Sequence, residues 1–332
     1  MFEDKIILIT GGTGSLGQAL TKRLLALNPA QIRIFSRNEL KQIEMESKLS
    51  DTRLRFLLGD VRDLDRLMRA TEDVDFVFHA AALKHVDKIE YNPFEAIKTN
   101  VTGSQNVIDA CLQNKVKKAI CIGTDKAVSP LNTYGATKLL MEKLFTSAAN
   151  YSNPKNYPTK FTALRYGNVF GSSGSVILKF IQQIKNKQKI TITDLNMTRF
   201  SITMDEALDF ILKATKLSKG KEIFVPELKS YSIQDVRDAL FELLQNTGEK
   251  IIGVRPGEKL HEVLVNKDEM SKTWKLDDLY VIPNSYSTTE QVQSTYDNIE
   301  KIKNSTQYSS ENTKRMTKDE LKNIISKYGM NN

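Results

Sequence analysis

The sequence has few of the residues that metal sites and disulfide frameworks need. Its 332 residues include two cysteines, Cys111 and Cys121, which fall in a predicted helix and a predicted strand and lack metal-ligand spacing. The three histidines, His79, His85 and His261, are dispersed along the chain. We therefore expect both cysteines to be core thiols in a reducing cytoplasm, and we expect no metal site.

Long apolar runs and dense basic stripes are also missing. The apolar segment at residues 6–9 is too short for a signal-peptide core or a membrane span, so we expect a cytoplasmic protein without a membrane partner. The formal net charge is +8, but the lysines are scattered and not interleaved with aromatic residues. We expect no nucleic-acid partner, because a solvated surface and attraction of anionic nucleotides explain the charge more simply.

The N-terminal segment has the pattern of a strand, a glycine-rich turn and a helix. An apolar run at residues 5–10 is followed by Gly11, Gly14 and Gly17 and then by an apolar-periodic segment at 19–27. Three glycines at this spacing allow a tight turn, close approach to a pyrophosphate and close helix packing, with the phosphates at the helix N-terminus. The pattern predicts a dinucleotide site.

The residues after the second predicted strand favour NADP over NAD. The strand at residues 31–35 is followed by Ser36, Arg37 and Lys41, with no Asp or Glu directly at its end to hold a ribose hydroxyl. Guanidinium and ammonium groups match a 2′-phosphate in charge and in hydrogen bonding. The alternative is that Arg37 and Lys41 only solvate a loop of a basic chain.

Strand and helix patterns alternate as far as about residue 170, which predicts an α/β fold with a Rossmann-type, doubly wound parallel sheet. Further buried strands are expected at residues 56–61, 74–79 and 118–123. Ligands of such sheets bind at the carboxyl ends of the strands. We therefore expect residues 60–61, 80–82 and 124–126 to converge on the glycine loop.

Beyond Gly167 the regularity weakens, and we expect a smaller, interwoven substrate-binding lobe. The predicted division gives residues 1–170 to the NADP-binding domain, with 200–226 rejoining it. Residues 171–199 and 227–332 form the substrate-binding lobe and a C-terminal tail. Apolar periodicity predicts helices at residues 204–217, 232–245 and 318–327, and a polar composition predicts an irregular tail at 284–313.

Five reactive side chains fall within fifteen residues: Thr124, Asp125, Lys126, Tyr134 and Lys138. The last two lie one helical turn apart on one face, so an ammonium can lower the pKa of the phenol and make Tyr134 a general base. A tyrosine and a lysine at this spacing are often only a solvated pair. The dinucleotide pattern upstream favours the catalytic interpretation.

Eight segments together resemble the extended short-chain dehydrogenase/reductases and, more narrowly, the inverting UDP-N-acetylglucosamine 4,6-dehydratases of pseudaminic acid and capsular sugar biosynthesis. They are residues 11–17, 36–42, 59–63, 80–86, 124–127, 134–138, 165–169 and 197–200. The resemblance covers nearly the whole chain, includes 255–259, and is faintest from 263 to 313. It implies an NADP-dependent lyase that acts on UDP-N-acetylglucosamine as a homo-oligomer.

The resemblance also implies the site residues. Cofactor contacts are implied for Gly11, Thr13, Gly14, Ser15, Leu16, Gly17, Ser36, Arg37, Asn38, Glu39, Leu40, Lys41, Asp60, Val61, Ala80, Lys84, Gly123, Tyr134, Lys138 and Val169. Substrate contacts are implied for Lys84, Asn168, Val176, Thr191, Arg199, Arg255 and Glu258. The two arginines suit a diphosphate, since a guanidinium binds it bidentately. Arg199, Arg255 and Glu258 could instead form surface or inter-lobe ion pairs.

The implied mechanism begins when Tyr134, assisted by Lys138, takes the proton of the hydroxyl on carbon 4 while NADP+ receives the hydride. Neutral Lys126 then removes the proton of carbon 5, and protonated Asp125 supplies a proton to the departing hydroxyl of carbon 6. The hydride returns to carbon 6, and reprotonation of carbon 5 from the opposite face inverts it. Such a lysine needs a lowered pKa, and the aspartate must stay protonated.

Three other functions remain open. A 4-epimerase would use Tyr134 and Lys138 but has no need of Asp125 and Lys126. A retaining dehydratase would give the other configuration at carbon 5; such enzymes resemble one another in having an Asp-Glu pair here, and Lys126 would then only pair with Asp125 or a phosphate. A non-catalytic dinucleotide-binding or RNA-binding module on the same fold would tolerate loss of the tyrosine-lysine pair.

Overall fold

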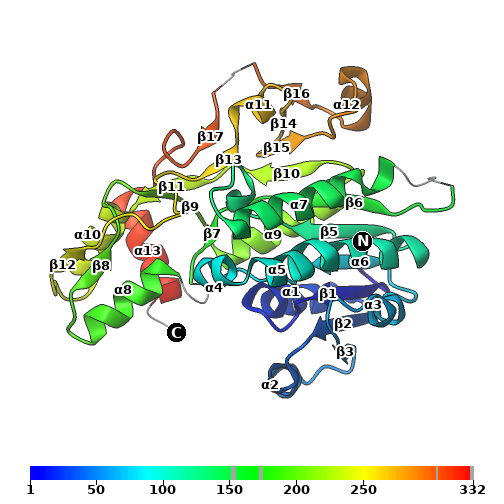
Figure 1. The fold of residues 1–332 in the computed structure, drawn as a ribbon, viewed down its shortest axis with the longest axis horizontal. Coiled ribbons are helices and arrows are strands. Elements are labelled where there is room, and N and C mark those ends of the chain that lie inside the picture. The colour runs from blue at the N-terminus through cyan, green and yellow to red at the C-terminus, as the bar shows by residue number, and fades with distance from the viewer. Residues whose placement is uncertain (151–154, 172–174, 304–305, 330–332) are drawn as a thin grey trace.

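A parallel sheet of the expected type runs through the centre of the molecule (Figure 1) in this computed structural model, which describes residues 1–150, 155–171, 175–303 and 306–329. Within these residues the sheet has ten strands in the order β16-β14-β15-β10-β6-β5-β4-β1-β2-β3. The strands from β3 to β10 in this order are parallel to their neighbours. They are β1 (Ile6–Thr10), β2 (Gln31–Ser36), β3 (Leu54–Leu58), β4 (Phe76–His79), β5 (Lys118–Ile122), β6 (Lys160–Leu164) and β10 (Ile223–Pro226). The predicted Rossmann-type, doubly wound fold is confirmed.

Helices cover both faces of this sheet. The longer ones are α1 (Ser15–Leu25), α2 (Glu39–Leu49), α3 (Leu64–Ala70), α6 (Gly103–Gln113), α7 (Thr133–Ser147) and α9 (Met204–Leu217). On β1, Ile7 and Ile9 belong to one apolar core with residues of α1 and α9, whereas Leu8 belongs to a second core with residues of α3, α6 and α7. Because side chains of a strand alternate between faces, this pattern places the sheet between two layers of helices.

Short helical segments lie where the chain leaves the sheet. They are α4 (Val86–Tyr91), α5 (Pro93–Ala96) and the π-helical turn η1 (Ile97–Thr102) after β4, the 3-10 turn η2 (Asp125–Ala127) after β5, and the 3-10 turn η3 (Ala148–Asn150) after α7. Turn η2 begins at Thr124, whose hydroxyl accepts a 3.4 Å hydrogen bond from the backbone N–H of Lys126. The turn therefore holds Asp125 and Lys126 at the carboxyl edge of the sheet.

The sheet continues further along the chain than the predicted division of lobes. Antiparallel strands extend it beyond β10: β15 (Leu279–Ile282), β14 (Trp274–Leu276) and β16 (Glu300–Lys301). Trp274 and Val281 are buried in the core of the sheet. The segment from 284 to 313, predicted to be irregular, contains α12 (Thr289–Thr295) and β17 (Tyr308–Ser309) as well as β16; its residues 304–305 lie outside the described part. The mostly polar composition of this segment gave no sign that apolar residues such as Val292 would be buried.

The second lobe has a core of its own, built from chain segments that alternate with those of the sheet. Its elements are β7 (Asn168–Val169), α8 (Val176–Lys185), β8 (Ile190–Ile192), β9 (Thr198–Ile202), β11 (Lys229–Ser232), α10 (Ile233–Leu243), β12 (Glu249–Ile251) and α13 (Lys318–Gly329). The short elements β13 (Val263–Val265) and α11 (Lys267–Met270) instead pack into the core of the sheet through Leu264 and Met270. Phe180, Leu240 and Ile325 bring α8, α10 and α13 together. The helices predicted at 204–217, 232–245 and 318–327 are confirmed as α9, α10 and α13.

A buried arginine joins β6, α7 and α11. Arg165 follows β6 and has no exposed side-chain surface. Its guanidinium donates to both carboxylate oxygens of Glu142 on α7, at 2.6 and 2.5 Å, and to both of Glu269 on α11, at 2.8 and 2.7 Å. Burial alone would lower the pKa of Arg165, but the two carboxylates outweigh it and raise that pKa. The cluster is a fully paired, bidentate ion triad.

Arg165→Met should lower the free energy of unfolding by about 3–5 kcal/mol, because it leaves two carboxylates without their buried counter-charge. Urea denaturation measures the loss. The matched control is Arg23→Met, which removes an arginine that also faces two carboxylates, Asp205 and Asp209, but at an exposed site. That variant should lose less than about 1 kcal/mol. Equal losses in the two variants would contradict the prediction.

Candidate active site

A cavity of about 910 Å³ lies at the carboxyl ends of the parallel strands and extends toward the second lobe. Most of the predicted cofactor residues and all of the predicted substrate residues line it. Glu39 and Leu40 do not; helix α2 begins there and leaves both side chains exposed. Asp125 lies fully buried beneath the cavity wall. The fold therefore brings together side chains that are as much as 247 residues apart, from Gly11 to Glu258, although their contacts with ligands stay predictions.

The glycine loop between β1 and α1 leaves space that side chains would fill. Gly11 has a φ of +69°, and a Cβ built on it would lie 2.8 Å from the backbone nitrogen of Ala81. A Cβ on Gly17 would lie 2.5 Å from the carbonyl oxygen of Gly12, so α1 can pack against the loop only with glycine here. The N-terminus of α1, which has no side-chain cap, faces the cavity. Bare backbone N–H groups at a helix start fit a pyrophosphate.

The turn after β2 and the first turn of α2 carry the cationic groups expected for a 2′-phosphate. Arg37 and Lys41 line the cavity with exposed side chains, and the Arg37 guanidinium lies 3.7 Å from Asp60. Burial would raise the pKa of Asp60, but hydrogen bonds from Arg62 outweigh it and lower that pKa. Asp60 therefore forms its shorter ion pair with Arg62, at 2.7 Å, and its ion pair with Arg37 is longer, at 3.7 Å. The residues present fit an anionic group beside a ribose.

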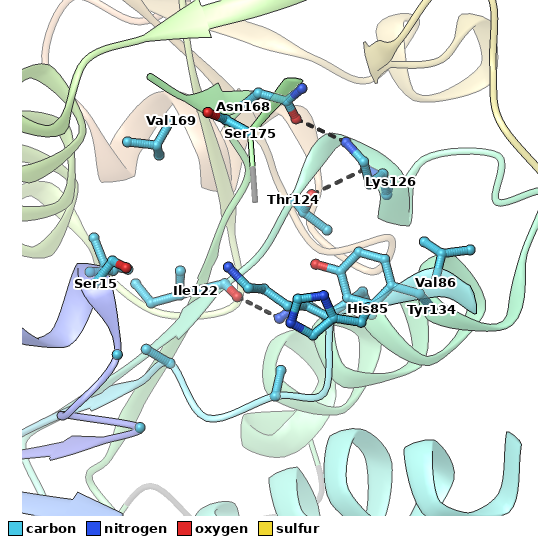
Figure 2. A pocket seen from close by; sticks show the side chains of 18 of the residues that line it. Ser15, His85, Val86, Ile122, Thr124, Lys126, Tyr134, Asn168, Val169 and Ser175 are labelled. Atoms are coloured by element: carbon cyan, nitrogen blue, oxygen red, sulfur yellow. Dashed lines mark hydrogen bonds between the residues drawn. The ribbon is translucent and has the colours of Figure 1, made fainter. Parts of the chain in front are cut away.

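Tyr134 and Lys138 lie side by side on α7, but not in the predicted electrostatic relation. The Tyr134 hydroxyl points into the cavity (Figure 2), and burial raises its pKa, with the Lys126 ammonium opposing that rise. Lys138 donates to the carbonyl oxygen of Ile122 at 2.7 Å and to the sulfur of Met141 at 3.2 Å. The prediction that Lys138 lowers the pKa of Tyr134 is therefore wrong for this arrangement, because the lysine is directed to the end of β5.

Lys126 is held by hydrogen bonds to two other residues of the site. Its Nζ donates to Asp125 Oδ1 and to Asn168 Oδ1, both at 3.0 Å, and Figure 2 shows the contact with Asn168 across the cavity. Asp125 Oδ1 also accepts from the Thr124 hydroxyl at 2.9 Å. Burial alone would lower the pKa of Lys126, but the carboxylates of Asp125 and Glu262 outweigh it and raise that pKa. The expected lowered pKa is therefore wrong; the pair is an ion pair.

Three side chains that the sequence did not reveal also line this part of the cavity: Tyr231, Lys259 and Glu262. Tyr231 is paired with Arg199 across strands β11 and β9. Lys259 Nζ donates to the carbonyl oxygen of Val128, and burial lowers its pKa. Lys259 ends the resembling segment 255–259, and Glu262 directly precedes the part of the chain where the resemblance is faintest. Their positions in the sequence do not indicate that they lie near Lys126; this proximity is seen only in the fold.

The arginines predicted to hold a diphosphate differ in how firmly they are placed. Arg199 donates to the carbonyl oxygens of Thr198 at 2.7 Å and Leu260 at 3.1 Å, which fixes its guanidinium at the cavity. Arg255 forms a 3.7 Å ion pair with Glu258, and both side chains are about a third to a half exposed. An exposed pair of this kind contributes little on its own. Arg255 can therefore exchange Glu258 for an anionic ligand.

A buried polar chain supports the loop after β4. His79 is fully buried, its Nδ1 lies 2.7 Å from the Thr10 hydroxyl, and its Nε2 lies 3.0 Å from the Ser104 hydroxyl. Since Ser104 donates to the carbonyl oxygen of Asn100 at 2.6 Å, it accepts from Nε2–H, and Thr10 donates to Nδ1. Thr10 in turn accepts the N–H of Ala81, a cavity residue, at 3.4 Å. Each ring nitrogen has a partner that fits a neutral imidazole.

Comparisons with known proteins agree with this geometry. Residues 7–284 match the family model described as polysaccharide biosynthesis protein. The chain is 45% identical to a UDP-N-acetylglucosamine 4,6-dehydratase (inverting) of Campylobacter jejuni subsp. jejuni serotype O:23/36, over 98% of both chains. It is 42% identical to a UDP-glucose 4-epimerase of Rickettsia conorii, over 98% of this chain and 96% of the other. The X-ray structure of Pen from Bacillus thuringiensis is 40% identical, with a TM-score of 0.91 over 98% of both chains.

Between about pH 7 and pH 4 the protein should lose stability because of His79. Burial first, and Lys138 second, lower the pKa of His79 from 6.5 to about 3. In that interval the unfolded chain binds one proton more than the folded chain, so stability falls as pH falls, by up to about 1.4 kcal/mol per pH unit. Urea denaturation at several pH values should show a shallower decline in His79→Gln. The control, exposed His85→Gln, should keep the parental slope; equal slopes in all three proteins would refute the assignment.

Proposed function

The chain belongs to the polysaccharide biosynthesis protein family of extended short-chain dehydrogenase/reductases, and on that premise we propose that it is an inverting UDP-N-acetylglucosamine 4,6-dehydratase. Its product is UDP-2-acetamido-2,6-dideoxy-β-L-arabino-hex-4-ulose, an intermediate toward pseudaminic acid or a related surface sugar. The observation that carries the proposal is the position of Lys126, whose Nζ lies 3.0 Å from Asp125 Oδ1 in the cavity that Tyr134 enters. An acid and a base are thus adjacent where water must be eliminated.

The ion-paired form of Asp125 and Lys126 and the form needed for catalysis differ only in the position of one proton. Asp125 and Lys126 are charged as they stand, whereas elimination needs a protonated Asp125 and a neutral Lys126. Moving one proton along the 3.0 Å hydrogen bond from Nζ to Oδ1 converts one form to the other without uptake from solvent. The raised pKa of Lys126 therefore does not prevent its use as a base.

The residues then have separate tasks. Tyr134 accepts the proton of the hydroxyl on carbon 4, while bound NADP+ would supply the acceptor for the hydride of carbon 4 and return it at carbon 6. Lys126 Nζ takes the proton of carbon 5, which the new ketone has made acidic. Asp125 gives its proton to the hydroxyl that leaves carbon 6. The second carboxylate oxygen of Asp125, Oδ2, is buried without a hydrogen-bond partner among the described residues.

A 4-epimerase is the second candidate, because a relative that is 42% identical has that name. Tyr134 and Lys138 would serve both reactions. Asp125 and Lys126 have no task in epimerisation, where no proton leaves carbon 5 and no water is lost. The buried ion pair therefore favours the dehydratase, and loss of water from the substrate distinguishes the two.

We further propose a homo-oligomer in the cytoplasm. Tyr91 on α4, Phe94 on α5 and Leu140 on α7 are 87%, 62% and 50% exposed, and large apolar side chains on neighbouring helices are typical of a protein interface. Cys111 and Cys121 are buried free thiols, which suits a reducing compartment. Within the described residues no helix is long and apolar enough to cross a membrane.

NADP is the proposed cofactor, and the test is a variant with both Arg37→Ala and Lys41→Ala. Loss of two charge-assisted contacts should weaken NADP binding by about 2–4 kcal/mol and leave NAD binding nearly unchanged, because NAD has no 2′-phosphate. Calorimetry with each dinucleotide measures both affinities. Lys48→Ala, which removes a charge from the exposed far end of α2, is the control. Equal affinity of the unmodified protein for NADP and NAD would exclude the assignment.

The product tests the function. UDP-N-acetylglucosamine incubated with the protein in deuterated water should lose water and give the L-arabino product with deuterium at carbon 5, as read by NMR. The hydrogen transferred to carbon 6 should come from carbon 4 and not from solvent. A product with the D-xylo configuration at early times would mean a retaining enzyme, and a 4-epimer without loss of water would mean an epimerase.

Two variants separate the half-reactions. Tyr134→Phe should block oxidation of carbon 4, whereas Lys126→Ala should permit oxidation and slow elimination by roughly 10²- to 10⁴-fold, the usual contribution of a general base. Single-turnover absorbance of the reduced cofactor follows the first step, and NMR follows the second. Lys185→Ala, at an exposed position on α8, is the control. If Lys126→Ala released dehydrated sugar at the parental rate, Lys126 would not be the base.

A further inference from the structure

Glu262 is a buried carboxylate in the wall of the active-site cavity, only 4% exposed. Its backbone N–H donates to the Ser310 hydroxyl at 2.9 Å, and its carbonyl oxygen accepts the Ser310 N–H at 2.8 Å. Both groups of its backbone are therefore held by the segment that contains β17. With the backbone held in this way, the side chain of Glu262 extends toward the cavity, which it lines.

Two cations face the Glu262 carboxylate. Oε1 lies 3.5 Å from Lys126 Nζ and 3.8 Å from Arg199 Nε. Oε2 is buried and has no hydrogen-bond partner among the described residues. Burial of an unpaired carboxylate is strongly unfavourable, so the two cations offset the desolvation cost of Glu262. Glu262 in turn restrains both of them.

The Lys126 ammonium is thus enclosed by oxygen atoms from three separate segments. Asp125 belongs to the turn after β5, Asn168 to β7, and Glu262 to the segment before β13. Asp125 must give up a proton in the reaction, and Asn168 is uncharged. Among the charged members of this set, Glu262 is therefore the one that can keep its negative charge throughout the reaction.

We propose that Glu262 is a positioning residue of the elimination step, an inference that rests on the proposed function. Its carboxylate orients Lys126 Nζ and stabilises the positive charge that Nζ gains in that step. The Nζ lone pair forms a bond to the proton of carbon 5. The electrons of that C–H bond form the double bond to carbon 6, the bond from carbon 6 to oxygen breaks, and the proton of Asp125 completes the departing water. No oxidant or reductant is consumed.

The sign of the electrostatic effect follows from the groups that face this centre. They are Asp125 on η2, Tyr134 on α7, Arg199 on β9, Tyr231 on β11 and Lys259 before β13. Arg199 and Lys259 disfavour a charge on Lys126, whereas Asp125 and Glu262 favour it. Removing the Glu262 charge leaves the cations in place. The pKa of Lys126 should then fall.

Glu262→Gln tests the inference, since it keeps the shape and removes the charge. Elimination should slow by roughly 10- to 100-fold, the loss expected when one contact to a charged group disappears. Oxidation of carbon 4, followed by single-turnover absorbance, should be nearly unchanged. The limb of the pH profile of elimination that reports Lys126 should move to lower pH. Glu311→Gln, which removes an exposed carboxylate beside His261, is the control and should match the parental protein.

A second comparison separates this role from a purely structural one. In a Lys126→Ala background, Glu262→Gln should cause little further loss, because a residue that acts through Lys126 has nothing left to act on. Glu262→Asp, which keeps the charge, should retain the parental pH limbs even where its rate is lower. Parental elimination in Glu262→Gln, an unshifted Lys126 limb, or an equal loss in the Lys126→Ala background would each overturn the inference. The parental protein, assayed beside the variants, reports on the proposed function: if it releases no water, that function fails instead.

Discussion

The Arg165 ion triad is the contact on which the rest of the site depends. Arg165 lies between β6 and Asn168, which bonds to Lys126. Glu142 belongs to the same helix as Tyr134 and Lys138, and Glu269 follows the segment that contains Glu262. One guanidinium therefore fixes three chain segments relative to one another. Because each of its bonds is bidentate, it fixes their orientation as well as their distance.

This rigidity suits chemistry that depends on the placement of protons. In the proposed mechanism the Asp125 oxygen and the Lys126 nitrogen change protonation while their positions stay fixed. Nearly equal numbers of buried carboxylates and cations permit the change in protonation and hold the atoms in place. Lys126 and Arg199 face Asp125 and Glu262, so a proton can move within the group without a large change in local charge.

Much of the fold follows from local patterns, and less of the site does. The apolar strand at β1, the glycine loop and helix α9 with its Thr203–Glu206 capping box each depend on residues close in sequence, and they were predictable. Strand β14 joins the sheet through long-range burial of Trp274, which composition does not reveal. The pKa of Lys126 also depends on long-range contacts: Asp125 is its neighbour, but Glu262 is 136 residues away. Adjacent acids and bases can be found in a sequence; their charge balance requires the fold.

The separation between Arg165 and Glu269 has a consequence for synthesis of the chain. The two residues are 104 positions apart, and Glu269 is made 43 residues after the end of β10, the last of the parallel strands of the central sheet. Until then Arg165 has only Glu142, and the turn after β5 lacks Glu262. The proposed centre for elimination therefore cannot be complete before residue 262 has been made, because Lys126 then still lacks its contact with Glu262.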